Sequence, residues 1–143
     1  MSKFIILFLV ATFYSCNQNP NEQRKVPQII EEAFKKLHPT ATILKWNDEP
    51  PIWEAKYQEG KEKGAVSFDS IAQIVETELV IAESELRNLP SIPKYIKENY
   101  SKETIKGCEK IEKKNGTIIY EIQITGKELL FDSTGNFLSE ELD

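Results

Sequence analysis

The stretch FDSIAQIVETEL, residues 68–79, is nearly repeated as FDSTGNFLSEEL, residues 131–142. Each copy opens with phenylalanine, aspartate and serine and closes with glutamate and leucine, and the positions between hold similar residues. An apolar residue, a polar turn and a second apolar run are typical of two strands joined by a tight turn. The two stretches therefore predict one β-hairpin that ends each of two related units.

The residues before each hairpin correspond as well. Helices are predicted over residues 26–39 and 92–100, where apolar residues recur at helical spacing. In the first helix, the expected inward stripe consists of Ile29, Ile30, Ala33, Phe34 and Leu37. Extended segments that alternate apolar and polar residues follow each helix, at residues 41–48, 52–58, 64–70 and 73–82 and at residues 104–114, 117–125, 127–133 and 136–142.

These elements predict an α+β fold of two tandem units, each a helix followed by four strands. We expect the units to span residues 26–83 and 84–143, with residues 83–90 as their connection. The strands should form one continuous antiparallel sheet with both helices on one face. The inward-facing aromatic residues should be Trp53, Phe68, Tyr120 and Phe131.

The two predicted hairpin turns differ at one position. Gly135 of the second turn can take a positive φ angle, whereas the first turn has Ala72 at the equivalent place. We therefore expect the first turn to have a different geometry. In both turns the aspartate and the serine should supply hydrogen bonds.

The first 16 residues, MSKFIILFLVATFYSC, indicate export. Lys3 precedes an apolar run over residues 4–14, which has the length of a secretory signal core and about half the ~20 residues of a membrane-spanning helix. The run ends at Ser15 and Cys16, which resemble the lipobox at which signal peptidase cuts before the lipid-bearing cysteine of a bacterial lipoprotein. Phe13 departs from the leucine usual in that motif, and an ordinary signal peptide with a stray cysteine is the alternative.

On the lipobox interpretation, residues 1–15 are a signal peptide and Cys16 becomes a lipid-bearing amino terminus. Each buried methylene adds roughly 0.8 kcal/mol, so several acyl chains would hold the protein firmly on a membrane. Residues 16–25 would then form a polar tether. We expect an exported protein that is lipid-anchored in the bacterial cell envelope, as a periplasmic or outer-membrane lipoprotein. Cys108 is left as a lone thiol that packs as a small apolar side chain.

The charge of the chain excludes some classes of partner. Removing residues 1–15 leaves 128 residues with 17 basic and 23 acidic side chains, a net charge of −6. Both signs are mixed along the chain and apolar residues recur throughout. This composition excludes a basic surface for nucleic acid and a disordered chain.

The sequence predicts no enzyme, no cofactor and no metal site. His38 is the only histidine, so the chain cannot assemble a zinc site or a Cys–His pair with a spare partner. Pairs of glutamates at residues 76 and 78 and at residues 140 and 141 are typical of solvent-exposed strands, with a ligand or acid–base site as the alternative.

Two other features are candidates for contact with other molecules. Trp46 lies in a strand whose inward face is ambiguous, so it either anchors a partner on the open sheet surface or packs in the core. The triplets Asp-Ser-Ile at 69–71 and Asp-Ser-Thr at 132–134 resemble a sequon for O-glycosylation of exported proteins in some bacteria. Turn formation is the alternative explanation of both triplets.

Taken in order, the motifs resemble the PepSY-like, beta-lactamase-inhibitor-like family of small exported bacterial proteins with tandem repeats. The matching motifs are LHP after the first helix, ILKW, the strands WEAKY and YEIQI, FD before each turn, and NLPSIPKYI at the start of the second unit. The resemblance covers roughly residues 26–142. It implies helices packed on an antiparallel sheet and no established enzymatic activity.

These observations lead to two functional hypotheses. The first is a membrane-anchored, non-catalytic envelope protein that binds or inhibits another envelope protein or peptide through the face or rim of its sheet. The alternative is a small-molecule or ion-binding envelope protein that uses the groove between the two units.

Overall fold

A computed structural model describes residues 24–142, and it shows an α+β fold built on one open antiparallel sheet of eight strands. The predicted signal peptide, Ser15, Cys16 and most of the tether lie outside the described residues. The elements in chain order are α1 (Gln28–Leu37), β1 (Thr42–Glu49), β2 (Ile52–Glu59), β3 (Glu62–Phe68), β4 (Ile74–Val80), the 3₁₀ helix η1 (Glu83–Asn88), α2 (Ser91–Asn99), β5 (Gly107–Lys113), β6 (Ile118–Ile124), β7 (Lys127–Asp132) and β8 (Phe137–Leu142).

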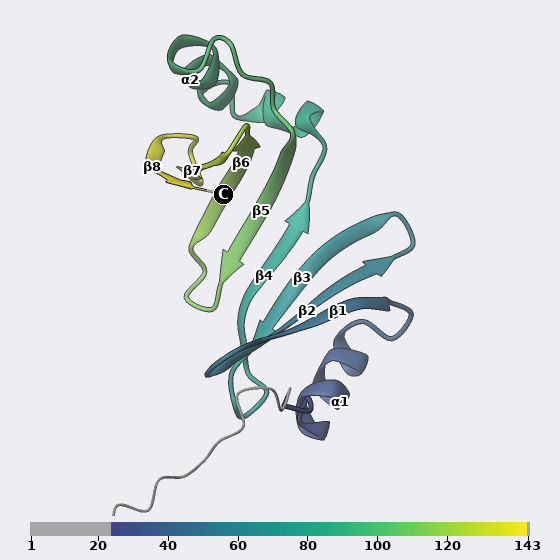
Figure 1. The fold of residues 1–143 in the computed structure, drawn as a ribbon. Helices are drawn as coiled ribbons and strands as arrows, with labels where there is room; N and C mark the ends of the chain where they lie inside the picture. The colour runs from purple at the N-terminus through teal and green to yellow at the C-terminus, as the bar shows by residue number, and fades with distance from the viewer. Residues whose placement is uncertain (1–23, 143) are drawn as a thin grey trace, which may run out of the picture.

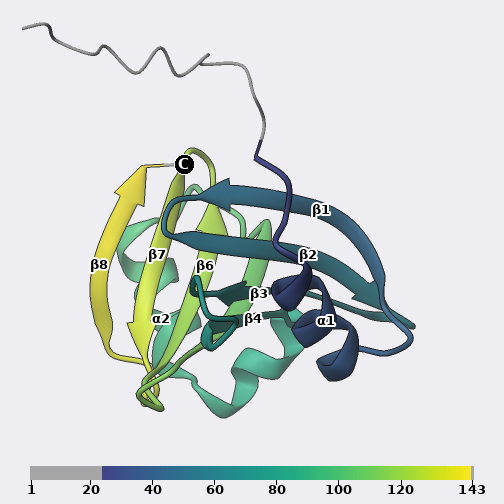
Figure 2. The ribbon, with the colours of Figure 1, turned by 90° about the horizontal axis from the view of Figure 1, so that it is seen from below.

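The order of strands in the sheet follows the order of the chain, from β1 at one edge to β8 at the other (Figure 1). The sheet is strongly twisted, so that β1 and β2 run across the direction of β7 and β8 when the molecule is seen from below (Figure 2). The predicted continuous antiparallel sheet is therefore confirmed. A helix precedes four strands twice along the chain, but the interpretation as two copies of one unit, divided at residues 83 and 84, stays a prediction.

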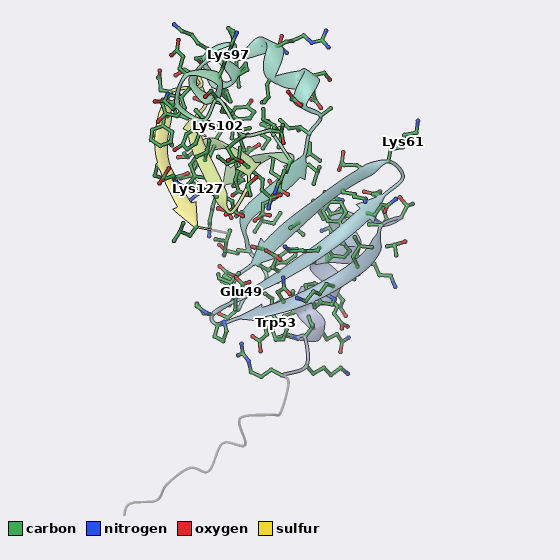
Figure 3. All side chains as sticks on the ribbon, turned by 45° about the horizontal axis from the view of Figure 1, so that its top comes forward. Glu49, Trp53, Lys61, Lys97, Lys102 and Lys127 are labelled. Carbon is green, nitrogen blue, oxygen red and sulfur yellow. The ribbon has the colours of Figure 1, made fainter. Side chains whose placement is uncertain are left out.

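Two separate apolar clusters lie between the helices and the sheet. The first joins α1 to β2 and β3 through Ile30, Phe34, Trp53, Ala55, Tyr57, Val66 and Phe68. The second joins η1 and α2 to β5, β6 and β7 through Leu86, Ile92, Ile96, Cys108, Ile122, Ile124, Leu129 and Phe131. Figure 3 shows Trp53 in the part of the molecule that holds α1, and Lys97 on α2.

Strand register shows that both helices cover the same face of the sheet. Tyr57, which packs under α1, is the first of a row of directly paired residues that crosses the sheet and ends at Phe131, which packs under α2. Directly paired residues share a face in an antiparallel sheet. The residues of the row are Tyr57, Gly64, Leu79, Lys110, Tyr120 and Phe131. We call this side the helix-covered face and the other side the open face.

Two expectations about the helical segments need correction. The side chains of Ile29 and Leu37 are 55% and 43% exposed, so α1 buries a narrower stripe than predicted, centred on Ile30 and Phe34. The reason is that α1 lies at one edge of a twisted sheet and meets it along a single i, i+4 line. The segment 83–90 is more than a connection, because η1 inserts Leu86 into the second cluster.

The two hairpin turns are more alike than the sequence suggested. Phe68 and Phe131 are buried, as predicted. Ala72 has a φ of +62° and Gly135 a φ of +83°, so both lie in the left-handed region and the expected difference in geometry is wrong. Asp69 and Asp132 accept hydrogen bonds from backbone amides of their turns. Among residues 24–142, the hydroxyls of Ser70 and Ser133 make no hydrogen bond that supports the turns, contrary to expectation.

Candidate binding face

The centre of the open face is a shallow hollow of about 400 Å³ that spans the boundary between β4 and β5. Strands on both sides of that boundary contribute to it. Its lining residues are Glu54, Lys56, Glu78, Gly107, Glu109, Glu121, Gln123 and Glu128. We call the five glutamates of this hollow the carboxylate cluster.

Period-two alternation places these side chains on the face opposite the helices. Glu54 follows Trp53, whose ring points into the first apolar cluster, and Glu121 precedes Ile122, which points into the second. Glu109 pairs directly with Glu121 across β5 and β6. Two like charges therefore face each other on adjacent strands, an arrangement that is unfavourable unless protons or cations compensate.

Glu54 is the most buried member of the cluster, with 8% of its surface exposed. The side-chain amide of Asn47 donates to Glu54 Oε1 at 2.6 Å, and Lys56 Nζ lies 3.6 Å from the same oxygen. Lys56 is the only basic residue that lines the hollow, and it pairs with Glu54. The other four glutamates therefore have no basic partner of their own in the hollow.

Burial, followed by the charges of the neighbouring carboxylates of Glu54 and Glu109, raises the pKa of Glu78 to about 7. Glu78 pairs directly with Ala65 on one side and with Ile111 on the other, and both are buried. The two apolar neighbours account for the loss of water around its carboxylate.

Glu121 behaves in the same way on the other side of the boundary. Burial, followed by the charges of Glu128 and Glu109, raises the pKa of Glu121 to about 7. Burial also raises the pKa of Glu109, and Lys56 partly opposes that shift. Glu78 and Glu121 therefore retain protons up to near-neutral pH and lose them as the pH rises through about 7.

Trp46, the predicted partner-binding residue, does not lie on the open face. Its ring meets the ring of Phe34 edge-on, with centroids 5.8 Å apart, on the helix-covered face at the rim of a cavity of about 220 Å³. Trp46 is partly buried there and belongs to the margin of the first cluster. A role for it in partner binding stays a prediction.

The other residues that the sequence singled out make contacts that stabilise the fold. The ring of His38 packs against that of Tyr57 at a tilt of 33°, with centroids 4.1 Å apart, and its Nδ1 lies 2.9 Å from Glu59 Oε2. Cys108 is a buried free thiol, as expected, and burial raises its pKa to about 11. Glu140 accepts a hydrogen bond from Lys127 Nζ at 2.8 Å and another from the hydroxyl of Tyr100 in the loop after α2.

Over residues 24–142, no group of three or more histidine, cysteine or acidic side chains has the arrangement of a metal site. In the same range, no helix has the length and apolar character needed to cross a bilayer. The alternative of a small-molecule site corresponds best to a cavity of about 210 Å³ near the boundary between β4 and β5. That cavity is lined by Ile81, Glu85, Asn88, Leu89, Lys110 and Tyr120.

The carboxylate cluster was not predicted from the sequence. Glu76 and Glu78 are a pair on one strand, whereas the cluster is assembled from single glutamates on five strands. The available signal was a glutamate beside an inward aromatic or aliphatic residue in WEAKY and YEIQI. The sequence did not show which strands would meet at the boundary.

Comparison with known proteins gives a fold but no family membership: no protein-family model and no curated protein matches the sequence. A BLIP-like protein from Bacteroides fragilis is 25% identical with a TM-score of 0.61, over 85% of this chain and 89% of that chain. A candidate periplasmic protein from Bacteroides eggerthii has a TM-score of 0.72 at 17% identity, over 83% and 90% of the two chains. A DUF2874 family protein from Bacteroides uniformis has a TM-score of 0.70 at 19% identity, over 82% and 90%.

The beta-lactamase-inhibitor-like part of the predicted resemblance is thus confirmed at the level of fold, because a BLIP-like protein shares the architecture. The PepSY-like part stays a prediction. The other two structures are less similar in sequence but have higher TM-scores, and they share the fold over more than four fifths of this chain.

Proposed function

We propose that this chain is a non-catalytic protein of the bacterial cell envelope that binds another envelope protein or peptide through its open face. The observation that carries the proposal is the carboxylate cluster, which lies uncovered at the centre of the only sheet in the described part of the chain. A face that served only as a solvated exterior would not need half-buried carboxylates whose pKa is raised by burial.

The chemistry of the face specifies the kind of partner. A protein surface that covered four uncompensated glutamates without bringing positive charge would bury them at a high cost in free energy. A partner loop with lysine or arginine side chains would pair with them instead, and the opposite charges would also speed the encounter. The buried apolar neighbours Ala65 and Ile111 would exclude water around such pairs.

The likeness to a BLIP-like protein supports binding or inhibition of a protein rather than catalysis. Fold alone does not assign a target, because one architecture hosts many functions. We therefore define the partner by its charge, and beta-lactamase is one protein among those to be tested.

Two variants on one strand test the surface. Glu109→Lys reverses a charge inside the cluster, whereas Glu112→Lys reverses an exposed charge on the helix-covered side of β5. After crosslinking in the native envelope and mass spectrometry, we expect Glu109→Lys to reduce partner recovery at least tenfold and Glu112→Lys to leave it unchanged. Equal recovery with both variants, or no recovered protein with the wild type, would contradict the proposal.

Lipid anchoring through Cys16 is the second part of the proposal, and it rests on the lipobox-like motif. Cells fed a labelled fatty acid should label the wild-type protein and leave Cys16→Ser unlabelled. A wild-type protein that carries no label and has a free amino terminus near residue 16 would favour the ordinary signal peptide instead.

A further inference from the structure

The β3–β4 turn exposes a serine and an isoleucine that do not belong to the apolar clusters and do not line the hollow of the open face. Ser70 is exposed, and its hydroxyl makes no hydrogen bond within the described part of the chain. The side chain of Ile71 is 63% exposed, more than that of any other isoleucine among residues 24–142. An apolar side chain held in water at the tip of a tight turn contributes nothing to the core.

The turn does not depend on either side chain. Asp69 Oδ1 accepts the amides of Ile71 at 3.0 Å and Gln73 at 2.9 Å, and Ala72 packs against the first apolar cluster. The carboxylate and the backbone therefore hold the loop, and Ser70 is free to react without loss of a structural hydrogen bond.

We propose that Ser70 is an O-glycosylation site, recognised through the triplet Asp69-Ser70-Ile71 that resembles the sequon described above. The second triplet provides a comparison inside the same molecule. Ser133 is also exposed, but the third residue, Thr134, is tied into its turn. Thr134 Oγ1 donates to Asp132 Oδ1 at 2.7 Å and lies 2.7 Å from Asn136 Nδ2.

A transferase that must contact the third residue of the triplet therefore meets a free side chain at Ile71 and an engaged one at Thr134. The second turn is also sterically closed on one side, because Ser91 of α2 lies against Gly135 and its Oγ is 3.4 Å from the carbonyl oxygen of Thr134. These differences make Ser70 the acceptor and Ser133 the internal control.

The reaction is a glycosyl transfer from a donor sugar linked through a diphosphate. The Ser70 hydroxyl oxygen forms a bond to the anomeric carbon, and the bond between that carbon and the diphosphate oxygen breaks. The diphosphate leaves with the bonding electron pair, and a base of the transferase takes the serine proton. The product carries one O-linked glycan and no change in oxidation state.

Modification at Ser70 is compatible with partner binding. No residue of the turn lines the hollow of the carboxylate cluster, so a glycan there would leave the open face accessible. The proposal requires export but does not require a protein partner, and the two can fail separately.

The test is peptide mapping of the full protein purified from the cells that naturally produce it. Cleavage after lysine and arginine separates the triplets, since Ser70 falls in the fragment 64–87 and Ser133 in the fragment 128–143. We expect a sugar mass on fragment 64–87 of the wild type and an unmodified fragment 128–143. Ser70→Ala and Ile71→Glu should both lose the mass, whereas Ser133→Ala should retain it.

Three outcomes would overturn the proposal: an unmodified fragment 64–87 in a wild-type protein whose amino-terminal peptide proves export, a sugar that persists in Ser70→Ala, or a sugar found only on fragment 128–143. Folding is monitored by thermal melts. Because all three positions are exposed, the three variants should have the same melting temperature as the wild type. Loss of the sugar then cannot be attributed to unfolding.

Discussion

In the turns that follow Phe68 and Phe131, the aspartate amide donates to the carbonyl of the residue four positions later, at 2.9 Å in both. The fourth residue of each turn returns a bond to the aspartate carbonyl, at 3.0 Å from Ala72 and 2.9 Å from Gly135. The surroundings of these two residues differ. Ala72 packs against the first cluster, whereas a Cβ at Gly135 would lie 2.3 Å from Ser91 Oγ.

The comparison separates two requirements that a glycine usually meets at once. The backbone conformation is tolerated by alanine in the first turn, because Asp69 and the strand ladder hold it against the cost of a positive φ. Glycine is needed in the second turn because α2 approaches closely there. Packing, rather than turn chemistry, therefore determines which residue each turn accepts.

The largest expected effect comes from removing the buried phenylalanine rings that directly precede the two turns. Phe68→Ala and Phe131→Ala should each lower the free energy of unfolding by about 3–5 kcal/mol, measured by urea denaturation. Phe131 should cost more, because its ring also meets Tyr95 and Phe137, with centroids 5.6 and 5.8 Å away. A loss below about 1 kcal/mol for either residue would show that the two positions are not equivalent parts of a core.

Gly135→Ala is the next test and should reduce stability by about 2 kcal/mol, from backbone strain and from the contact with Ser91 combined. Thermal or urea denaturation measures it. Adding Ser91→Ala should recover part of the loss, because the atom 2.3 Å away is removed. No recovery in the double variant would assign the whole effect to the backbone angle and erase the distinction between the turns.

Glu78 and Glu121 extend the comparison to the open face, since one lies in β4 and the other in β6. The folded-state pKa of each is raised from 4.5 to about 7, so their favourable contribution to stability is present at low pH and is lost as pH rises through about 7. At pH 8, Glu78→Gln should be more stable than the wild type by on the order of 1 kcal/mol, a value reduced for residual solvent screening.

The same measurement at pH 4 should show almost no difference between Glu78→Gln and the wild type, because both side chains are then uncharged. Glu109→Gln should lower the apparent pKa of both Glu78 and Glu121, since the Glu109 charge contributes to both shifts. Carboxyl chemical shifts followed by NMR as a function of pH would report each group separately. If both groups titrated near 4.5, the inferred electrostatic interaction across the β4–β5 boundary would be wrong.

The smallest effect is expected for Ala72→Gly. Relief of the positive φ is opposed by the greater freedom of glycine in the unfolded chain and by the lost methyl contact with the first cluster. The net change in the free energy of unfolding should stay within about 0.5 kcal/mol. A gain well above 1 kcal/mol in urea denaturation would mean that the first turn is more strained than its hydrogen bonds indicate.

Local pattern was sufficient to predict the sheet, both hairpins and the burial of Phe68 and Phe131, because period-two alternation and turn residues act over a few positions. It failed where contacts are made between distant segments. Leu86 sits in a polar stretch and is buried only because η1 closes over the second cluster. Ala72 was expected to change its turn, yet Asp69 and the pairing of β3 with β4 hold it in the left-handed region.

The carboxylate cluster likewise depends on contacts between distant segments, which local sequence patterns do not specify. Alternation in WEAKY and YEIQI places Glu54 and Glu121 opposite the core, but their nearness depends on the register between β4 and β5, which no turn residue fixes. Trp46 was ambiguous for a related reason. The bulge between Ile43 and Lys45 shifts the alternation in β1 and turns the indole toward α1.

The meander order of the strands has a consequence for how the molecule is made. Every strand pairs with the segment that comes just before or after it in the chain, so the residues of the first apolar cluster all lie before residue 73. That cluster can close as soon as β3 and the turn after it have emerged, with no contribution from later segments. The strands of the second half then add one after another to the edge formed by β4. This order keeps the entropic cost of loop closure low at each step of folding.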